Sequence, residues 1–102
     1  MRPIPLKMRK ELEADPFMKE CVCTGDTKDV TWEHCWTYAG KQINEKWAIV
    51  PLTRELNVNP TREAKEYCRW VSINRATEKD FEKYPRKDWK GIKKYLNDNY
   101  GN

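Results

Sequence analysis

The sequence predicts an α+β protein in which a small β-hairpin is framed by several helices. The chain has 102 residues, enough for one domain with a modest core. Short apolar stretches bounded by turn formers fill its first half, and helical spacing of apolar residues fills its second half. We therefore expect a single domain with an N-terminal helical part (1–20), a core (21–58) and a helical C-terminal part (59–102).

The N-terminal part is expected to contain one short helix over residues 5–14. Leu6, Met8 and Leu12 are its candidate core contacts among charged residues of both signs. The helix should end at Asp15, because a proline follows and the residue before proline is displaced from the helical region.

The core begins with two predicted strands, over residues 21–23 and 30–35. The segment between them, CTGDTKD, is rich in turn formers, so the two strands are expected to pair as a hairpin. Residues 38–44 are interpreted as a loop, and residues 47–50 as a short apolar run before a proline.

Helical signals follow from residue 51 onward. Residues 51–57 begin with proline and are interpreted as a helical turn. Asn59 and the proline after it predict the cap and first turn of a helix over residues 60–74. The apolar spacing of this helix is expected to bury Ala64, Tyr67, Cys68 and Val71.

Two further helices are predicted near the C-terminus. Thr77 should cap a short helix through Phe81, and residues 86–98 should form the last helix. Trp89, Ile92 and Leu96 lie on one side of that helix. A cluster of aromatic side chains is expected in the core rather than as a stacking platform for bases: Trp32, Trp36, Tyr38 and Trp47.

Positive charge is concentrated in the C-terminal part. The net charge is +4, and residues 83–95 alone hold six cations against one acid. Such residues are often merely solvated, but this density, with Tyr84 and Trp89 interleaved, favours contacts with the phosphates of duplex DNA. The candidate DNA-binding cations are Lys83, Arg86, Lys87, Lys90, Lys93 and Lys94.

The cysteine pattern does not favour a structural zinc site. One residue separates the first two cysteines and the others lie far apart, whereas zinc ligands usually pair across two to four residues. Small buried thiols are the preferred interpretation of Cys21, Cys23, Cys35 and Cys68. With a charged N-terminus and no apolar run long enough to span a membrane, we expect a cytoplasmic protein with no membrane contact.

The residues most suggestive of chemistry are Glu33, His34, Asn44 and Asn57. A histidine can take a proton from water, and carboxylate and amide oxygens suit Mg²⁺ or Mn²⁺. Glu33 and Asn57 are candidate metal ligands, His34 the candidate base, and Asn44 a candidate to orient the imidazole. Consecutive strand residues point to opposite faces, so Glu33 and His34 share a site only if the strand ends or distorts there.

The stretch 31–57 resembles HNH nucleases, whose ββα-metal site places a base histidine at a strand end. The segments W-E-H, Y-A-G-K-Q, E-K-W-A-I-V-P-L and N-R-A-T look like those of small phage and prophage recombination endonucleases, with similarity over about residues 3–89. The resemblance implies a ββα-metal-like core and a metal-dependent DNA endonuclease in a bacterial host. It assigns His34 as base and Glu33 and Asn57 as ligands.

One departure from the family and several alternatives stay open. Close relatives are expected to carry paired histidines where this chain has Leu56 and Asn57, so Asn57 either substitutes as ligand or marks an inactive, DNA-binding or host-protein-binding relative. Asn57 also suits a turn or cap, and His34 suits the half-buried end of a strand. Gln42 is an alternative to Asn44, and with Lys41 a candidate phosphate contact. Duplex or branched DNA and a homodimer are the expected partners.

Overall fold

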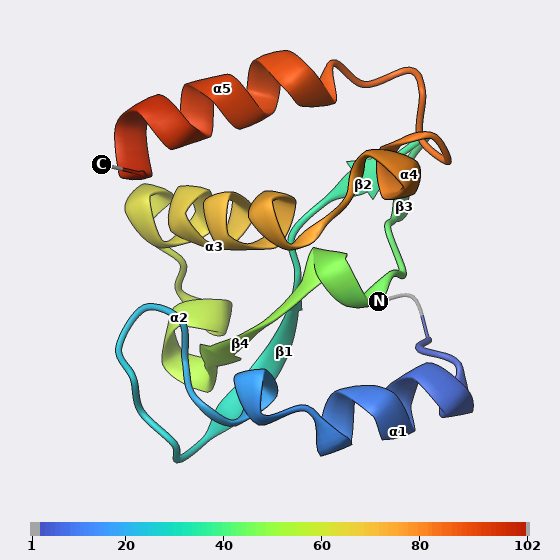
Figure 1. Ribbon diagram of the computed structural model, residues 1–102. Helices are drawn as coiled ribbons and strands as arrows, with labels where there is room; N and C mark the ends of the chain where they lie inside the picture. The colour runs from blue at the N-terminus through green and yellow to red at the C-terminus, as the bar shows by residue number, and fades with distance from the viewer. Residues whose placement is uncertain (1–2, 102) are drawn as a thin grey trace.

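The computed structural model describes residues 3–101 and confirms the α+β class (Figure 1). The helices are α1 (Leu6–Ala14), α2 (Arg54–Val58), α3 (Arg62–Arg75), α4 (Glu78–Phe81) and α5 (Trp89–Tyr100), with 3₁₀ helices η1 (Pro16–Lys19) and η2 (Lys46–Ala48). The strands are β1 (Val30–His34), β2 (Thr37–Tyr38), β3 (Lys41–Gln42) and β4 (Ile49–Thr53). No helix within the described residues combines the length and apolar character that a membrane crossing requires.

The main sheet consists of β1 and β4, which pair in antiparallel orientation with His34 opposite Ile49. The expected hairpin between residues 21–23 and 30–35 is wrong. Residues 22–24 form a turn, and the Val22 N–H donates to the carbonyl of Pro51 in β4. β1 pairs with β4 because the apolar run at residues 49–52 is fully buried, whereas the polar residues after Cys23 are exposed.

A second, smaller hairpin occupies the segment predicted as a loop. β2 and β3 pair through Thr37 opposite Gln42, and the turn between them holds Ala39 and Gly40 at φ values of 53° and 79°. Two central residues with positive φ are the geometry of a tight hairpin turn whose twist matches its strands. This hairpin reverses the chain after His34, so the segment leading to β4 returns past the end of β1.

The N-terminal helix begins one residue later than predicted, and of its three predicted core contacts Leu12 and Met8 are confirmed whereas Leu6 is wrong. Leu12 is 1% exposed, as expected, whereas Leu6 is 66% exposed and contributes little to the core. The helix ends before Asp15, whose side chain accepts a hydrogen bond from the Phe17 N–H and starts η1. Asp15 therefore both ends one helix and caps the next.

Two boundaries in the second half differ from the sequence interpretation. Pro51 lies inside β4 instead of starting a helical turn, and α2 begins only at Arg54. The α3 helix is capped by Thr61, whose side chain accepts from the Ala64 N–H, so it starts two residues later than the Asn59 signal suggested. The predicted cap at Thr77 is confirmed, because a reciprocal capping box with Asp80 is present.

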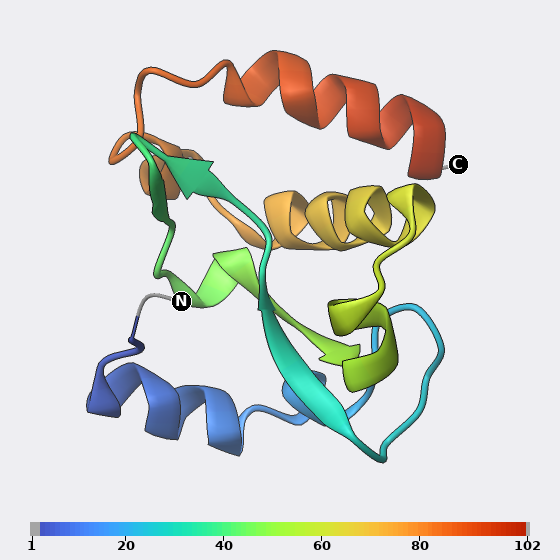
Figure 2. The same cartoon turned by 180° about the vertical axis from the view of Figure 1, so that it is seen from behind.

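The core has two parts on opposite sides of the main sheet. α1 covers one side, and α3 and α5 lie on the other (Figures 1 and 2). The smaller part joins Leu12, Met18 and Ile49, and the larger is built around three buried tryptophans: Trp36, Trp47 and Trp89. Of the expected aromatic core residues, Trp32 and Tyr38 are half-buried.

The buried face of α3 includes a polar residue that apolar spacing does not predict. Ala64 and Cys68 are buried as expected, together with Ile73 and Ser72. The Ser72 hydroxyl is fully buried and accepts a 2.6 Å hydrogen bond from the Trp36 indole N–H. This bond satisfies a donor inside the core, which would otherwise cost about 1–3 kcal/mol.

The four cysteines differ in their burial. Cys21, Cys35 and Cys68 are buried free thiols, whereas Cys23 is exposed and departs from the expectation of buried thiols. Burial raises the pKa of Cys35 to about 12, because the thiolate would lose its hydration. No group of three or more His, Cys, Asp or Glu side chains arranged to hold a metal ion occurs in residues 3–101.

Candidate functional site

His34 is the last residue of β1, and its imidazole contacts Asn44 across the chain reversal. The distance from His34 Nε2 to Asn44 Oδ1 is 3.2 Å. The other end of the Asn44 amide donates from Nδ2 to the carbonyl of Pro3 at 2.7 Å. Since Nδ2 is used as a donor there, Oδ1 accepts from Nε2–H, and the neutral ring keeps its lone pair on Nδ1.

The second ring nitrogen of His34 is buried and has no hydrogen-bond partner within the described chain. The side chain is 9% exposed, yet it lines a hollow of about 500 Å³ together with Thr31, Trp32 and Asn57. A buried polar atom without a partner costs about 1–3 kcal/mol, so its retention needs a reason. Nδ1 carries the lone pair of the neutral ring, and an attacking water reaches it only if the side chains that enclose it move.

Asn57 lies in α2 and is tied to the main sheet. Its Nδ2 donates to Thr31 Oγ1 at 2.8 Å, and that hydroxyl donates to the carbonyl of Leu52 at 2.8 Å. The cap of α3 is Thr61, so Asn57 does not fill the capping role that the sequence also allowed. Its Oδ1 is not used by the bond to Thr31 and can act as an oxygen ligand.

Glu33 points to the other face of β1 from His34. The strand is regular here, with Glu33 opposite Val50 and His34 opposite Ile49. Glu33 is half-buried and lines a hollow of about 200 Å³ with His34, Lys65 and Arg69. The structure therefore does not gather all the predicted residues in one hollow: His34 lines both, Asn57 lines one and Glu33 lines the other.

The electrostatics of Glu33 are set by burial. Loss of hydration raises the pKa of this carboxyl, and the positive charges of Lys65 and Arg69 oppose that rise. The net effect is a pKa above the usual value for glutamate. Additional positive charge beside the carboxyl would stabilise its ionised form.

The donors near His34 agree in kind with a hard divalent cation. Mg²⁺ is commonly held by one or two oxygen ligands and keeps several of its waters. Thr31 and Glu33 share a face of β1 and are two residues, roughly 7 Å, apart along the strand. Asn57 and Glu33 line different hollows, whereas two oxygen ligands of one Mg²⁺ lie within about 4 Å of each other. The oxygen types therefore suit such an ion, but the structure does not bring the two side chains together around one position.

The cations expected to contact DNA differ in their partners within the protein. Lys83 pairs with Glu45 at 3.7 Å and Lys94 with Asp98 at 2.9 Å, while Lys87 donates to the carbonyl of Thr37. The remaining expected contacts lie on the hairpin, on the segment before α5 and on α5: Lys41, Gln42, Arg86, Lys90 and Lys93.

Sequence reasoning missed Lys65 and Arg69, the cations that lie beside Glu33. Their spacing of four residues on α3 places them on one helical face, which is a signal the sequence contains. Only the apolar face of this helix was considered, and the proximity of that charged face to β1 depends on the tertiary packing.

Comparison of the chain with protein-family models, with curated proteins and with solved structures gave no match. The residues themselves therefore carry any functional conclusion.

Proposed function

We propose that this protein is a metal-dependent DNA endonuclease of the HNH type that hydrolyses phosphodiesters in phage or prophage recombination or DNA processing. The observation that carries the proposal is the hydrogen bond between His34 and Asn44 at the end of β1. The bond lies within a strand, a chain reversal, a second strand and a short helix, which follow one another along the chain. These are β1, residues 35–48, β4 and α2. The sequence resemblance of residues 31–57 to HNH nucleases supports the same assignment.

The role of His34 in this proposal is to accept a proton from the attacking water. Asn44 holds the proton on Nε2, which leaves Nδ1 as the basic atom, and its carbonyl oxygen would stabilise the imidazolium that forms. A positioned base of this kind contributes about 10²–10⁴-fold to a rate. Asn44 acts through His34 and is a positioning residue.

Glu33 and Asn57 would hold the cation in this proposal. A bound Mg²⁺ or Mn²⁺ supplies neutralisation of phosphate charge and stabilisation of the leaving oxygen. Thr31 Oγ1 accepts a hydrogen bond from Asn57 Nδ2 and so orients the amide. Oδ1 of that amide is left for the cation.

A second candidate function is DNA binding without cleavage. The observation that favours it is the placement of Glu33 and Asn57 in separate hollows on either side of the His34 ring. In that case the basic residues bind duplex or branched DNA, and the His34–Asn44 pair is structural.

The two candidates are separated by incubating supercoiled plasmid with Mg²⁺ or Mn²⁺ and either the wild type or His34→Ala. The proposal expects metal-dependent nicking by the wild type and a loss of at least about 100-fold in the variant. Asn44→Ala should also lose activity, whereas Asn99→Ala, a matched amide removal on α5, should not. Equal nicking by wild type and His34→Ala rejects the nuclease. Absence of nicking, with DNA binding retained, favours the second candidate.

A further inference from the structure

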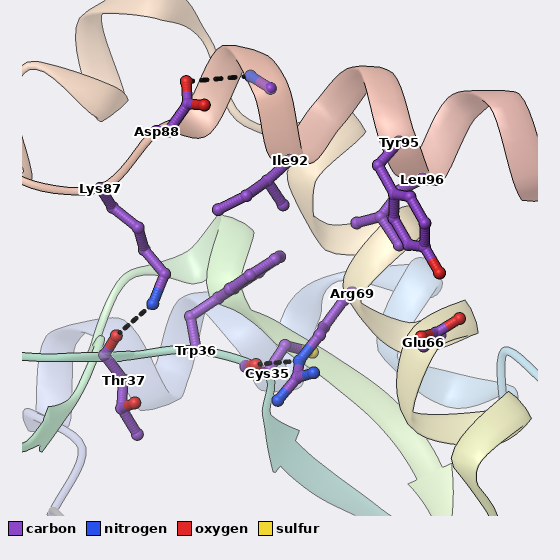
Figure 3. Close-up of a pocket in the computed structure, with 11 residues that line it drawn as sticks. Cys35, Trp36, Thr37, Glu66, Arg69, Lys87, Asp88, Ile92, Tyr95 and Leu96 are labelled. Carbon is purple, nitrogen blue, oxygen red and sulfur yellow. Dashed lines mark hydrogen bonds between the residues drawn. The ribbon is translucent and has the colours of Figure 1, made fainter.

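A hollow of about 530 Å³ lies between α3, α5 and the segment that joins β1 to β2 (Figure 3). Its apolar lining includes Trp36, Ile92 and Leu96, and two cations, Arg69 and Lys87, also line it. In Figure 3 the Trp36 side chain lies between these two cations. The hollow therefore combines an apolar interior with two cations, and two acids, Glu66 and Asp88, also line it.

The two cations are fixed by backbone carbonyls on either side of Trp36. Arg69 Nε donates to the carbonyl of Cys35 at 3.3 Å, and Lys87 Nζ donates to that of Thr37 at 3.1 Å. The Arg69 guanidinium carbon lies 5.6 Å from the centre of the Trp36 ring, and Lys87 Nζ lies 5.7 Å from it. Both charges are thus held against one indole.

These charges are only partly compensated. Neither cation has a carboxylate oxygen within 4 Å in residues 3–101, and carbonyls and an aromatic face carry only partial negative charge. The two acids that line the hollow keep their negative charges and offset the cations in total charge, but their oxygens accept hydrogen bonds from other groups. Glu66 accepts from the Tyr100 hydroxyl at 2.7 Å, and Asp88 accepts from the Gly91 N–H at 3.1 Å as the cap of α5. An anion would be stabilised by both cations through charge-assisted hydrogen bonds.

The hollow adjoins the smaller one that Glu33 and His34 line. Cys35, Trp36, Thr37 and Arg69 line both hollows. Arg69 therefore lines both the hollow that contains Lys87 and the hollow that contains the candidate catalytic histidine. Lys65, one helical turn before Arg69 on α3, extends the positive charge toward Glu33.

We propose that Arg69 and Lys87 form a binding site for one phosphate of the DNA strand, next to the phosphodiester at His34. The proposal rests on the proposed function, because it takes DNA as the ligand. In it, the hollow between α3 and α5 positions the DNA strand. The other flank of α5, where Lys90 and Lys93 share a hollow with Glu78 and Glu82, is not part of this site.

The test is fluorescence anisotropy of a labelled DNA duplex in EDTA, titrated at several salt concentrations. Arg69→Gln/Lys87→Gln should bind about tenfold more weakly than wild type at low salt. The slope of log K against log[salt] should become shallower by about 0.9, the value for one lost phosphate contact. The matched control, Lys7→Gln/Lys10→Gln, removes the same charge from exposed positions of α1 and should leave the slope near that of the wild type.

A charge-conserving variant, Arg69→Lys/Lys87→Arg, guards against a general effect on folding and should retain the wild-type slope. An unchanged slope in Arg69→Gln/Lys87→Gln, an equal change in the control, or no binding of DNA by the wild type would overturn the phosphate site. Plasmid nicking reports separately on the nuclease. If the wild type nicks plasmid but Arg69→Gln/Lys87→Gln keeps the wild-type salt slope, the phosphate site is rejected and the nuclease is not. If the slope changes only in Arg69→Gln/Lys87→Gln and the wild type does not nick plasmid, the phosphate site is supported and cleavage is rejected.

Discussion

Replacing Asn44 with alanine removes the carboxamide that fixes the His34 ring. The variant loses the 3.2 Å contact to His34 Nε2 and the 2.7 Å bond to the Pro3 carbonyl. Because Nδ1 is already without a partner, the buried imidazole would then have neither nitrogen bonded to protein. Leaving a buried donor unsatisfied costs about 1–3 kcal/mol, so Asn44→Ala should lower the free energy of unfolding by that amount.

The part of this loss that belongs to the His34–Asn44 pair is isolated by a double-mutant cycle. Urea unfolding of the wild type, His34→Ala, Asn44→Ala and the double variant gives the coupling free energy, and the Pro3 bond cancels because both Asn44 variants lack it. We expect a coupling of about 1 kcal/mol in favour of the pair. A coupling indistinguishable from zero would refute the inference that Asn44 holds the imidazole in place.

Three further predictions concern burial. Because burial raises the pKa of Glu33, Glu33→Gln should raise the free energy of unfolding at neutral pH in chelator, and this gain should vanish below pH 4.5, where the acid is protonated in both states. Ser72→Ala should destabilise the fold by about 1–3 kcal/mol in urea unfolding, since the Trp36 N–H loses its acceptor; wild-type stability would contradict this. With a pKa of about 12, the Cys35 thiol should react with a thiol reagent near neutral pH only after unfolding, whereas exposed Cys23 reacts first; equal rates in the folded protein would contradict this.

The helix boundaries that were predicted correctly have local signals, whereas the proline signals at Pro51 and after Asn59 gave wrong helix starts. The Thr77 cap is read from neighbouring residues, and so is the end of α1 at Asp15. The strand pairing was not predictable in the same way, since β1 and β4 are separated by a hairpin. Pro51 also argued against a strand, yet a strand paired on one side only can accommodate a residue without an N–H.

In the candidate site, too, only the contact between residues close in sequence was predictable. His34 and Asn44 meet because the chain reverses between them, and a loop after a strand end already suggested this. Glu33 lies on the opposite face because β1 stays regular to its last residue, which sequence alone did not decide. Arg69 was missed because its place beside β1 depends on how α3 packs against the sheet.

The proposed function requires Glu33 and Asn57, which line separate hollows, to come together around one divalent cation beside His34. Isothermal titration calorimetry with Mn²⁺ tests it most directly, using the wild type, Glu33→Gln and Asn57→Ala. We expect one bound ion in the wild type and markedly weaker binding in both variants. No uptake by the wild type, or equal uptake by all three proteins, would contradict it.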